Sequence, residues 1–254
     1  MTIFTAALNL ILGAAYTGYG ILTALEMKRG WRKFGFSHFG AAWIAMAFTC
    51  GPHHLAHGFH LGFEGRQAGI LDMAAVLIGL PLGVIWLYLR VEAFNGGRGD
   101  RLIGGNPGWI LALPTVAGIY VTAMVAAMIG TGGPMEFAMP LLPNVGLFVV
   151  YMMIGYFLLK TQLTAHRGAG GWSLSGLSLT GVFPTCAIMH GLYIFYATRG
   201  LYENDIHTLL IDFIGVPAGI YFLWVVRRLY LQSLPDWNQK GKVRVAHRRA
   251  AEAV

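Results

Sequence analysis

Charged side chains are scarce in this chain of 254 residues: Asp, Glu, Lys and Arg make up 11% of it, against 56% hydrophobic residues. A soluble globular protein carries about 25% charged residues. The deficit indicates that lipid surrounds much of the folded chain. The basic residues fall between apolar segments and in the C-terminal tail, not on a mixed basic and aromatic face, so no binding of nucleic acid is expected.

Cysteine is also rare, and both cysteines, Cys50 and Cys186, lie inside apolar segments. A disulfide framework of the secreted type is therefore not expected. The histidine-rich segment described below lacks the glutamate of a His-Glu-x-x-His protease helix, and the glycine-rich segment 96–99 lacks the preceding strand of a phosphate-binding loop. These absences argue against that protease class and against a nucleotide site.

What remains is a series of long apolar segments. A hydrocarbon core about 30 Å thick needs roughly 20 residues of helix. Seven segments meet this length: Ile3–Met27, Phe39–His60, Ala68–Val91, Trp109–Gly130, Leu141–Leu163, Trp172–Thr198 and His207–Leu229. They predict an all-α integral membrane protein, with a seven-helix transmembrane domain over residues 1–230 and a basic tail over residues 231–254.

The basic residues predict how these spans are oriented. All of the 18 Lys and Arg residues except Arg66 and Arg199 fall on one side of the predicted membrane. Cytoplasmic loops hold the excess of positive charge, so the N-terminus is predicted outside and the tail in the cytoplasm, which requires an odd number of spans. We expect a bacterial inner (plasma) membrane protein in contact with membrane lipids, with partner membrane subunits as a further candidate.

The second predicted span carries four histidines within eight positions, His53, His54, His57 and His60. At 100° per residue, these histidines and Cys50 fall within an arc of roughly 120° on one side of a helix. Ionisable side chains in a bilayer face the bundle interior, and imidazole is a favoured ligand of zinc, copper and iron. The alternative is that His57 and His60 lie among the headgroups while the others hydrogen-bond to neighbouring helices.

Donors on three other spans are predicted at the same depth, in the outer half of the bundle. One helix rarely encloses a metal, so such donors are needed. The predicted metal ligands are His53, His57, His60, His190 and His207. Asp72 and Asp212 are predicted as catalytic groups that orient ligands or transfer protons, or as ligands themselves, although a helix-cap or loop-facing role is equally open to them.

Three functions are compatible with this pattern. The first is a metal-dependent enzyme that uses Zn, Cu or Fe to activate water or oxygen, on a lipid-like substrate reached from the bilayer. The second is electron transfer through haem b, with His57 or His53 and His190 as axial ligands. The third is a proton or metal-ion transporter, or a structural subunit of a larger membrane complex.

The layout of seven spans with an outside N-terminus resembles that of microbial rhodopsins. That family holds retinal on a lysine of its last helix, and the span His207–Leu229 contains no lysine. Zinc-dependent seven-helix hydrolases, which include alkaline ceramidases and adiponectin receptors, also combine histidine and aspartate from several helices. They carry a paired histidine motif on the last span, where this chain has His207 alone. Membership of neither family is inferred.

Overall fold

The computed structural model describes residues 1–105, 141–200 and 210–231, together with the isolated positions 116, 119, 120, 122, 123 and 126. The described secondary structure is helical except for two short strands. The long helices are α1 (Thr2–Phe34), α2 (His38–Phe63), α3 (Ile70–Phe94), α5 (Leu142–Ala169), α6 (Leu174–Thr198) and the helix Leu210–Leu231.

Five of these helices are long and apolar enough to cross a membrane, namely α1, α3, α5, α6 and Leu210–Leu231. The remaining helix, α2, has 26 residues and is long enough, but its histidines lower its mean hydropathy. The chain is therefore a helical membrane protein. The predicted span Trp109–Gly130 and the basic tail lie almost wholly outside the described residues, so the total of seven spans stays a prediction.

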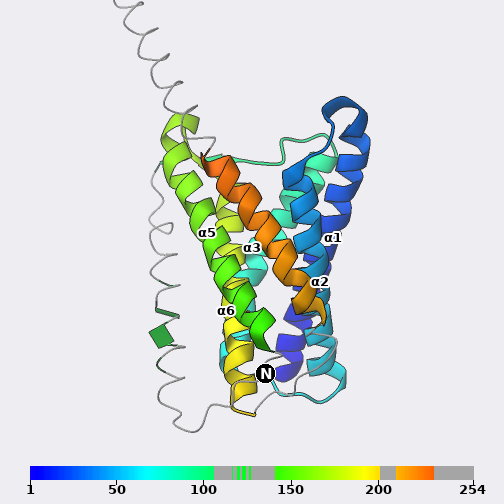
Figure 1. Cartoon of the computed structure of the whole chain (residues 1–254), viewed down its shortest axis with the longest axis vertical. Helices are drawn as coiled ribbons and strands as arrows, with labels where there is room; N and C mark the ends of the chain where they lie inside the picture. Colours follow the sequence, from blue (N-terminus) through cyan, green and yellow to red (C-terminus); the bar gives the residue numbers. More distant parts are fainter. Residues whose placement is uncertain are drawn as a thin grey trace, which may run out of the picture.

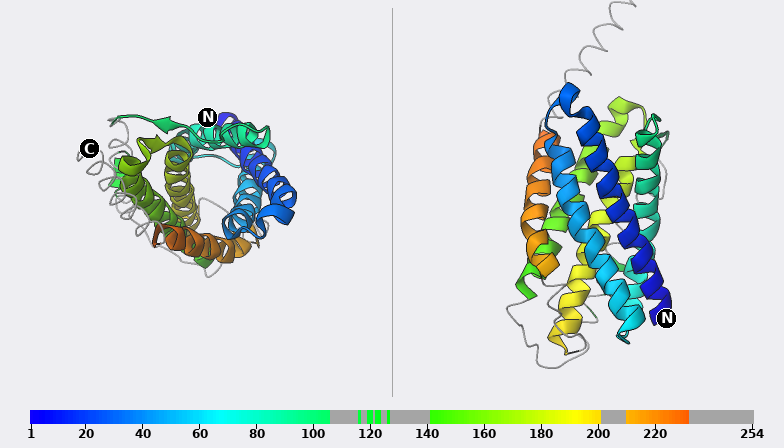
Figure 2. Two further views of the ribbon diagram at one scale, coloured as in Figure 1. Left: turned by 90° about the horizontal axis from the view of Figure 1, so that it is seen from above. Right: turned by 90° about the vertical axis from the view of Figure 1, so that its right-hand side faces the viewer.

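The helices pack side by side and form a closed ring when viewed along the bundle (Figures 1 and 2). In this ring α1 contacts α2 and α3, and α6 contacts α3 and α5. The helix Leu210–Leu231 lies between α2 and α5, because its Phe222 packs on Phe39 and its Gly219 lies close to Val150. Trp43 of α2 meets Phe183 of α6 edge-on, with ring centroids 5.8 Å apart. Thus α2 and α6 approach each other inside the bundle.

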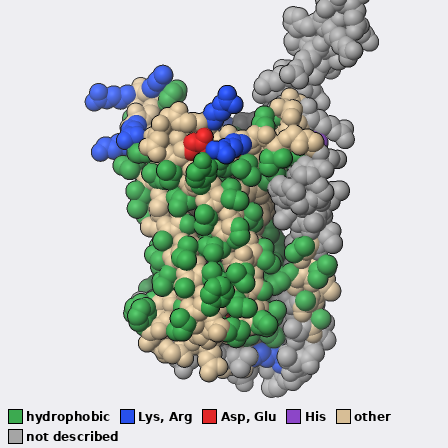
Figure 3. Space-filling view, turned by 180° about the vertical axis from the view of Figure 1, so that it is seen from behind, with side chains coloured by type: hydrophobic (Ala, Val, Ile, Leu, Met, Phe, Trp, Pro, Cys, Tyr) green, Lys and Arg blue, Asp and Glu red, His purple; other side chains and the backbone are tan. Residues whose placement is uncertain are grey.

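Basic side chains gather at one end of the molecule, above sides that are largely apolar (Figure 3). The helix ends that carry Arg29, Arg90 and Arg228 meet there because α1, α3 and Leu210–Leu231 run in the same direction. We call this end the basic end. It is the end that the sequence assigns to the cytoplasm, and both α2 and α6 start from it.

An aromatic core fills the bundle toward the basic end. Its buried side chains are Tyr19, Trp43, Trp86, Phe183 and Phe222. Their rings contact one another, with centroid distances of 4.6 Å for the first two and 5.2 Å for the last two. Aromatic pairs of this kind contribute beyond the area that they bury. The core therefore provides a rigid, apolar base beneath the histidines of α2.

Glycines allow α1 and α2 to approach closely. A Cβ atom added at Gly13 would lie 2.8 Å from the backbone oxygen of Gly51 and 2.8 Å from the backbone nitrogen of Leu55. One added at Gly20 would lie 2.9 Å from Cβ of Ala47. Small residues at helix crossings are typical of membrane proteins, where close backbone packing replaces the hydrophobic effect. This contact fixes where α2 lies in the ring.

A small structure at the basic end was not predicted from the sequence. The strand β1 (Leu102–Ile103) pairs antiparallel with β2 (Trp172–Ser173). The predicted sixth span begins at Trp172, whereas α6 begins at Leu174 because the two preceding residues pair with β1. Asp100 accepts hydrogen bonds from Ser173 Oγ (2.6 Å) and from the backbone nitrogen of Ser175 (2.9 Å), which ties this loop to the start of α6.

Candidate functional site

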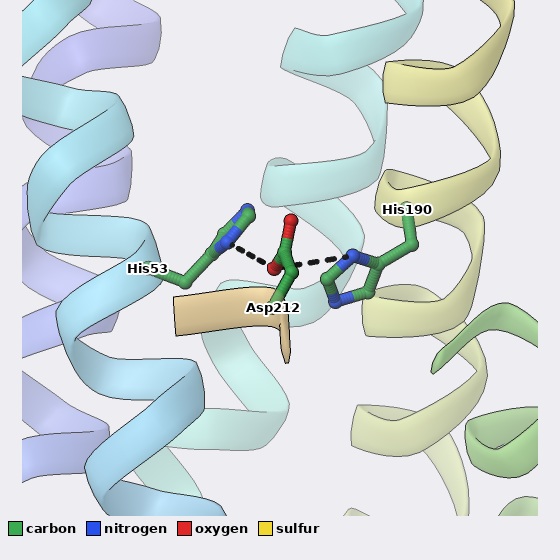
Figure 4. A group of neighbouring side chains, drawn as sticks. All are labelled: His53, His190 and Asp212. Atoms are coloured by element: carbon green, nitrogen blue, oxygen red, sulfur yellow. Dashed lines mark ion pairs between the residues drawn. The ribbon is translucent and has the colours of Figure 1, made fainter. Parts of the chain in front are cut away.

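Three of the predicted site residues come together from three helices: His53 of α2, His190 of α6 and Asp212 of the helix Leu210–Leu231. One potential ligand atom from each lies within 4.8 Å of those of the other two. Oδ1 of Asp212 is 2.9 Å from Nδ1 of His53 and 3.8 Å from Nδ1 of His190. Figure 4 shows the two imidazole rings approaching the carboxylate from opposite sides. We call these three residues the His/Asp cluster.

The cluster is shielded from its surroundings. The side chain of Asp212 is 1% exposed, that of His190 7% and that of His53 13%. A carboxylate buried in an apolar bundle is costly unless cations or hydrogen-bond donors compensate it. Here the two imidazoles and the amide of Asn144, whose Nδ2 donates to Oδ2 of Asp212 at 2.8 Å, surround it. This set of partners explains how the carboxylate is kept inside the bundle.

Asn144 also sets the protonation of His190. Its Oδ1 lies 2.7 Å from Nδ1 of His190. Because the amide nitrogen of Asn144 already donates to Asp212, its oxygen must accept, and Nδ1 of His190 carries the proton. Neutral His190 then keeps the lone pair of Nε2 for a ligand. Both ring nitrogens of His190 lie on the side that faces Asp212 (Figure 4).

The contact between His53 and Asp212 is different in kind. Nδ1 of His53 and Oδ1 of Asp212 are 2.9 Å apart, which is within hydrogen-bond range. Their relative orientation does not meet the criteria for a hydrogen bond, so Nδ1 of His53 has no hydrogen-bond partner among the described residues. We read it as an electrostatic contact, since hydrogen bonds weaken steeply away from a linear arrangement. Nδ1 of His53 is therefore held against the carboxylate without being saturated by it.

The His/Asp cluster lines a small cavity of about 10 Å³, which also touches Cys50 and Tyr151. A volume of this size holds one water molecule or one ion. Aromatic contacts keep the two imidazole rings in place: the ring centroids of His53 and His190 are 5.0 Å apart, and Tyr151 meets His190 edge-on at 5.5 Å. The site is thus small, closely packed and built for a single small occupant.

Other predicted site residues are not brought into the cluster. His60 contacts Oε2 of Glu64 at 2.5 Å at the end of α2, and Glu64 in turn lies 3.8 Å from Arg66. Asp72 accepts a hydrogen bond from the backbone nitrogen of Gly69 at 2.8 Å and so caps the start of α3. This is the helix-cap role that the sequence left open for it.

The remaining histidines have separate places. His57 is partly buried on α2 and is not a member of the His/Asp cluster. His207 lies outside the described residues. His54 points to α1, where its Nδ1 is 2.9 Å from Oδ1 of Asn9 and its ring meets Tyr16. Since His54 follows His53 by about 100° around the helix, the two face different neighbours.

The sequence analysis missed Asn144 and Tyr151. Asn144 is fully buried near the start of α5, and a polar amide inside an apolar segment was the available signal. Tyr151 carried no such signal, because a tyrosine in a membrane span is more often a packing residue.

Comparisons with known proteins bring no further information. No family model, no curated protein and no solved structure matches this chain. Its function is therefore argued from the geometry of the His/Asp cluster.

Proposed function

We propose that this protein is a membrane-embedded metalloprotein that binds one transition-metal ion between His53, His190 and Asp212. The observation that carries the proposal is the convergence of two imidazoles and one carboxylate within 4.8 Å. Metal–nitrogen bonds of about 2.0–2.1 Å place the ligand atoms of a tetrahedral site roughly 3.3 Å apart. The arrangement needs only small side-chain movements to reach that geometry.

The charge of the cluster suits a divalent cation. Two neutral imidazoles and one carboxylate give a net charge of about −1, which offsets part of the ion's charge inside an apolar bundle. The unsaturated Nδ1 of His53, 2.9 Å from Asp212, is also explained if a cation satisfies both groups. Asn144 then orients two of the proposed ligands, because it hydrogen-bonds to both Asp212 and His190.

The ligand set points to zinc, copper or iron. Zinc sites that catalyse reactions commonly have three protein ligands and a water molecule, and two histidines with one carboxylate also form iron(II) centres that bind oxygen. Three protein ligands leave at least one position open, so we propose a metal-dependent enzyme that activates water or oxygen. The sequence left three roles open for Asp212, as a ligand, an orienting group or a proton-transferring group, and we propose the role of ligand.

A lipid-like substrate remains part of the proposal, because the cluster lies among helices that can cross a membrane. The apolar cavity of about 290 Å³ between α3, α5 and α6 is not proposed as the binding site of this substrate. Ile188, which lines that cavity, lies roughly 160° around α6 from His190. A substrate would therefore approach the metal from the side of α2 and Leu210–Leu231.

No observation favours the alternative of haem b. The carboxylate of Asp212 lies between His53 and His190, whose ring centroids are 5.0 Å apart. The adjoining cavity of about 10 Å³ is far smaller than a porphyrin. His57, the other histidine considered for haem, is not a member of the cluster.

Metal analysis with a visible spectrum tests the proposal. The wild-type protein, purified in detergent after growth with zinc, copper and iron, is expected to hold at least one equivalent of metal without a haem band. The His53→Ala/His190→Ala variant is expected to hold one equivalent less than the wild type. The matched control His57→Ala/His60→Ala, which also removes two imidazoles, is expected to retain the metal. A well-folded wild type without metal would refute the proposal and favour a cluster that handles protons.

Asn144 provides a second prediction. Asn144→Leu removes the donor to Asp212 and the acceptor from His190, so metal affinity should fall by about 10- to 100-fold, as for other residues that orient metal ligands. Competition with a chelator measures the affinity. Asn9→Leu is the control, because Asn9 is equally buried and binds His54, outside the cluster. Equal losses in the two variants would mean that the effect reflects general destabilisation.

A further inference from the structure

Two thiols lie one helical turn from the histidines of the cluster, on the side of the basic end. Cys50 precedes His53 by three residues on α2, and Cys186 precedes His190 by four on α6. Both thiols line one small cavity, and both are free cysteines. The helices that present the two histidines therefore also bring two thiol-bearing residues to one cavity.

A third sulfur-containing side chain completes the group. Met46 lies one turn before Cys50 on α2 and is 1% exposed. Together with Cys50 and Cys186 it lines a second small cavity of about 10 Å³. The other described residues that line this cavity are apolar or aromatic, and they include no carboxylate and no imidazole. The donors available to an occupant are thus sulfur atoms and the hydroxyl group of Tyr16.

Each thiol has a tyrosine hydroxyl beside it. Oη of Tyr151 is 3.1 Å from Sγ of Cys50, and Oη of Tyr16 is 3.6 Å from Sγ of Cys186. When a thiol loses its proton, sulfur accepts and the phenol donates, so each tyrosine is placed to stabilise a thiolate. The tyrosines come from α5 and α1, on opposite sides of the sulfur pair. An anionic sulfur pair would thus have two hydrogen-bond donors in an otherwise apolar core.

We propose that Cys50, Cys186 and Met46 form a second metal site, specific for Cu(I). Thiolates and thioethers are the soft ligands that select Cu(I), whereas Mg²⁺ and Ca²⁺ need oxygen ligands and structural zinc needs four donors. Binding replaces two S–H protons with two Cu–S bonds, releases both protons and leaves the oxidation states unchanged. The complex has a net charge of −1, which the two tyrosine hydroxyls stabilise. Cys50 lines both small cavities, so the two sites are neighbours.

An anaerobic titration with Cu(I) against a chromogenic Cu(I) chelator tests the site, on full-length protein in detergent with both thiols reduced. Wild type is expected to bind one equivalent in competition with the chelator, and Cys50→Ser/Cys186→Ser is expected to lose it. Met46→Leu, which keeps the volume of the side chain, should bind at least about tenfold more weakly. The control His53→Ala/His190→Ala should retain the equivalent, because the sulfur site is separate from the proposed His/Asp centre.

Several results would overturn the proposal. Reduced wild type that binds no Cu(I), or a double serine variant that elutes as a folded protein and still binds it, would remove the site. Loss of the Cu(I) equivalent in the histidine variant but not in the serine variant would assign the ion to the His/Asp cluster instead. Unchanged affinity in Met46→Leu would remove Met46 from the ligand set. Failure of the His/Asp centre to bind metal leaves the expected Cu(I) result unaltered, so the two proposals fail separately.

Discussion

Asp212→Asn is expected to abolish stoichiometric metal binding while the fold is kept. The substitution preserves the shape of the side chain and leaves an oxygen that can accept from Asn144. It removes the one anionic member of the His/Asp cluster, so a bound cation would be left without a buried counter-charge. Breaking such a buried pair costs about 3–5 kcal/mol, which corresponds to a loss of about two to four powers of ten in affinity. Titration with Zn²⁺ against a competing chelator measures this loss.

Asp72→Asn is the matched control for this experiment. Asp72 is also buried and also hydrogen-bonded, but its carboxylate caps α3 and lies outside the cluster. This variant should lose some stability and keep its metal. If Asp212→Asn binds metal as tightly as the wild type, the carboxylate is not a ligand, and the cluster is a hydrogen-bonded network with no need of a cation.

Gly13→Leu is expected to cause the largest loss of stability. A Cβ atom at Gly13 meets backbone atoms of α2, the oxygen of Gly51 and the nitrogen of Leu55, each at 2.8 Å. Backbone atoms cannot move aside as the end of a side chain can, so α1 and α2 must separate. We expect a loss of about 3 kcal/mol, the upper part of the usual range for overpacking. Unfolding by a denaturing detergent, followed by circular dichroism, measures the change.

Gly18→Ala is the control on the same helix. A Cβ at Gly18 meets only the side chain of Leu87, at 3.8 Å, which is an ordinary contact. Replacing glycine by alanine inside a helix favours the helix, so this variant should be as stable as the wild type or slightly more stable. Because α2 carries His53, Gly13→Leu should also weaken metal binding. If Gly13→Leu is as stable as Gly18→Ala, the close α1/α2 contact does not determine the stability of the fold.

Much of the helical architecture follows from the sequence, although the ends of helices do not. The prediction placed the end of the first span at Met27, whereas α1 continues to Phe34 and includes Lys28 and Arg32. Hydropathy marks where hydrocarbon ends, and a helix continues into the headgroup region without hindrance. The end of α5 shows the same limit: it was predicted at Leu163, but the helix continues to Ala169 and stops at Gly170, which has a positive φ.

His53, His190 and Asp212 were all among the predicted site residues, but the sequence did not show which of the predicted residues would meet. Helical spacing placed His53, His54 and His57 within one broad arc, and depth matched them to Asp72 and Asp212. Which of them meet depends on the order of helices around the ring, and a single sequence does not contain that order. Two asparagines show most clearly which residues meet. Asn9 of α1 contacts His54, and Asn144 hydrogen-bonds to both Asp212 and His190.

The modest hydropathy of α2 has a consequence for how the protein is made. A segment leaves the translocon for lipid according to its apolar character, and α2, with its five histidines, has no stretch that meets the hydropathy of a membrane span as the five other long helices described do. The helix synthesised just before it, α1, is apolar and presents glycines that fit α2 closely. We therefore expect α2 to enter the bilayer as one arm of a hairpin with α1. The close α1/α2 contact would then determine, during synthesis, whether α2 inserts into the membrane.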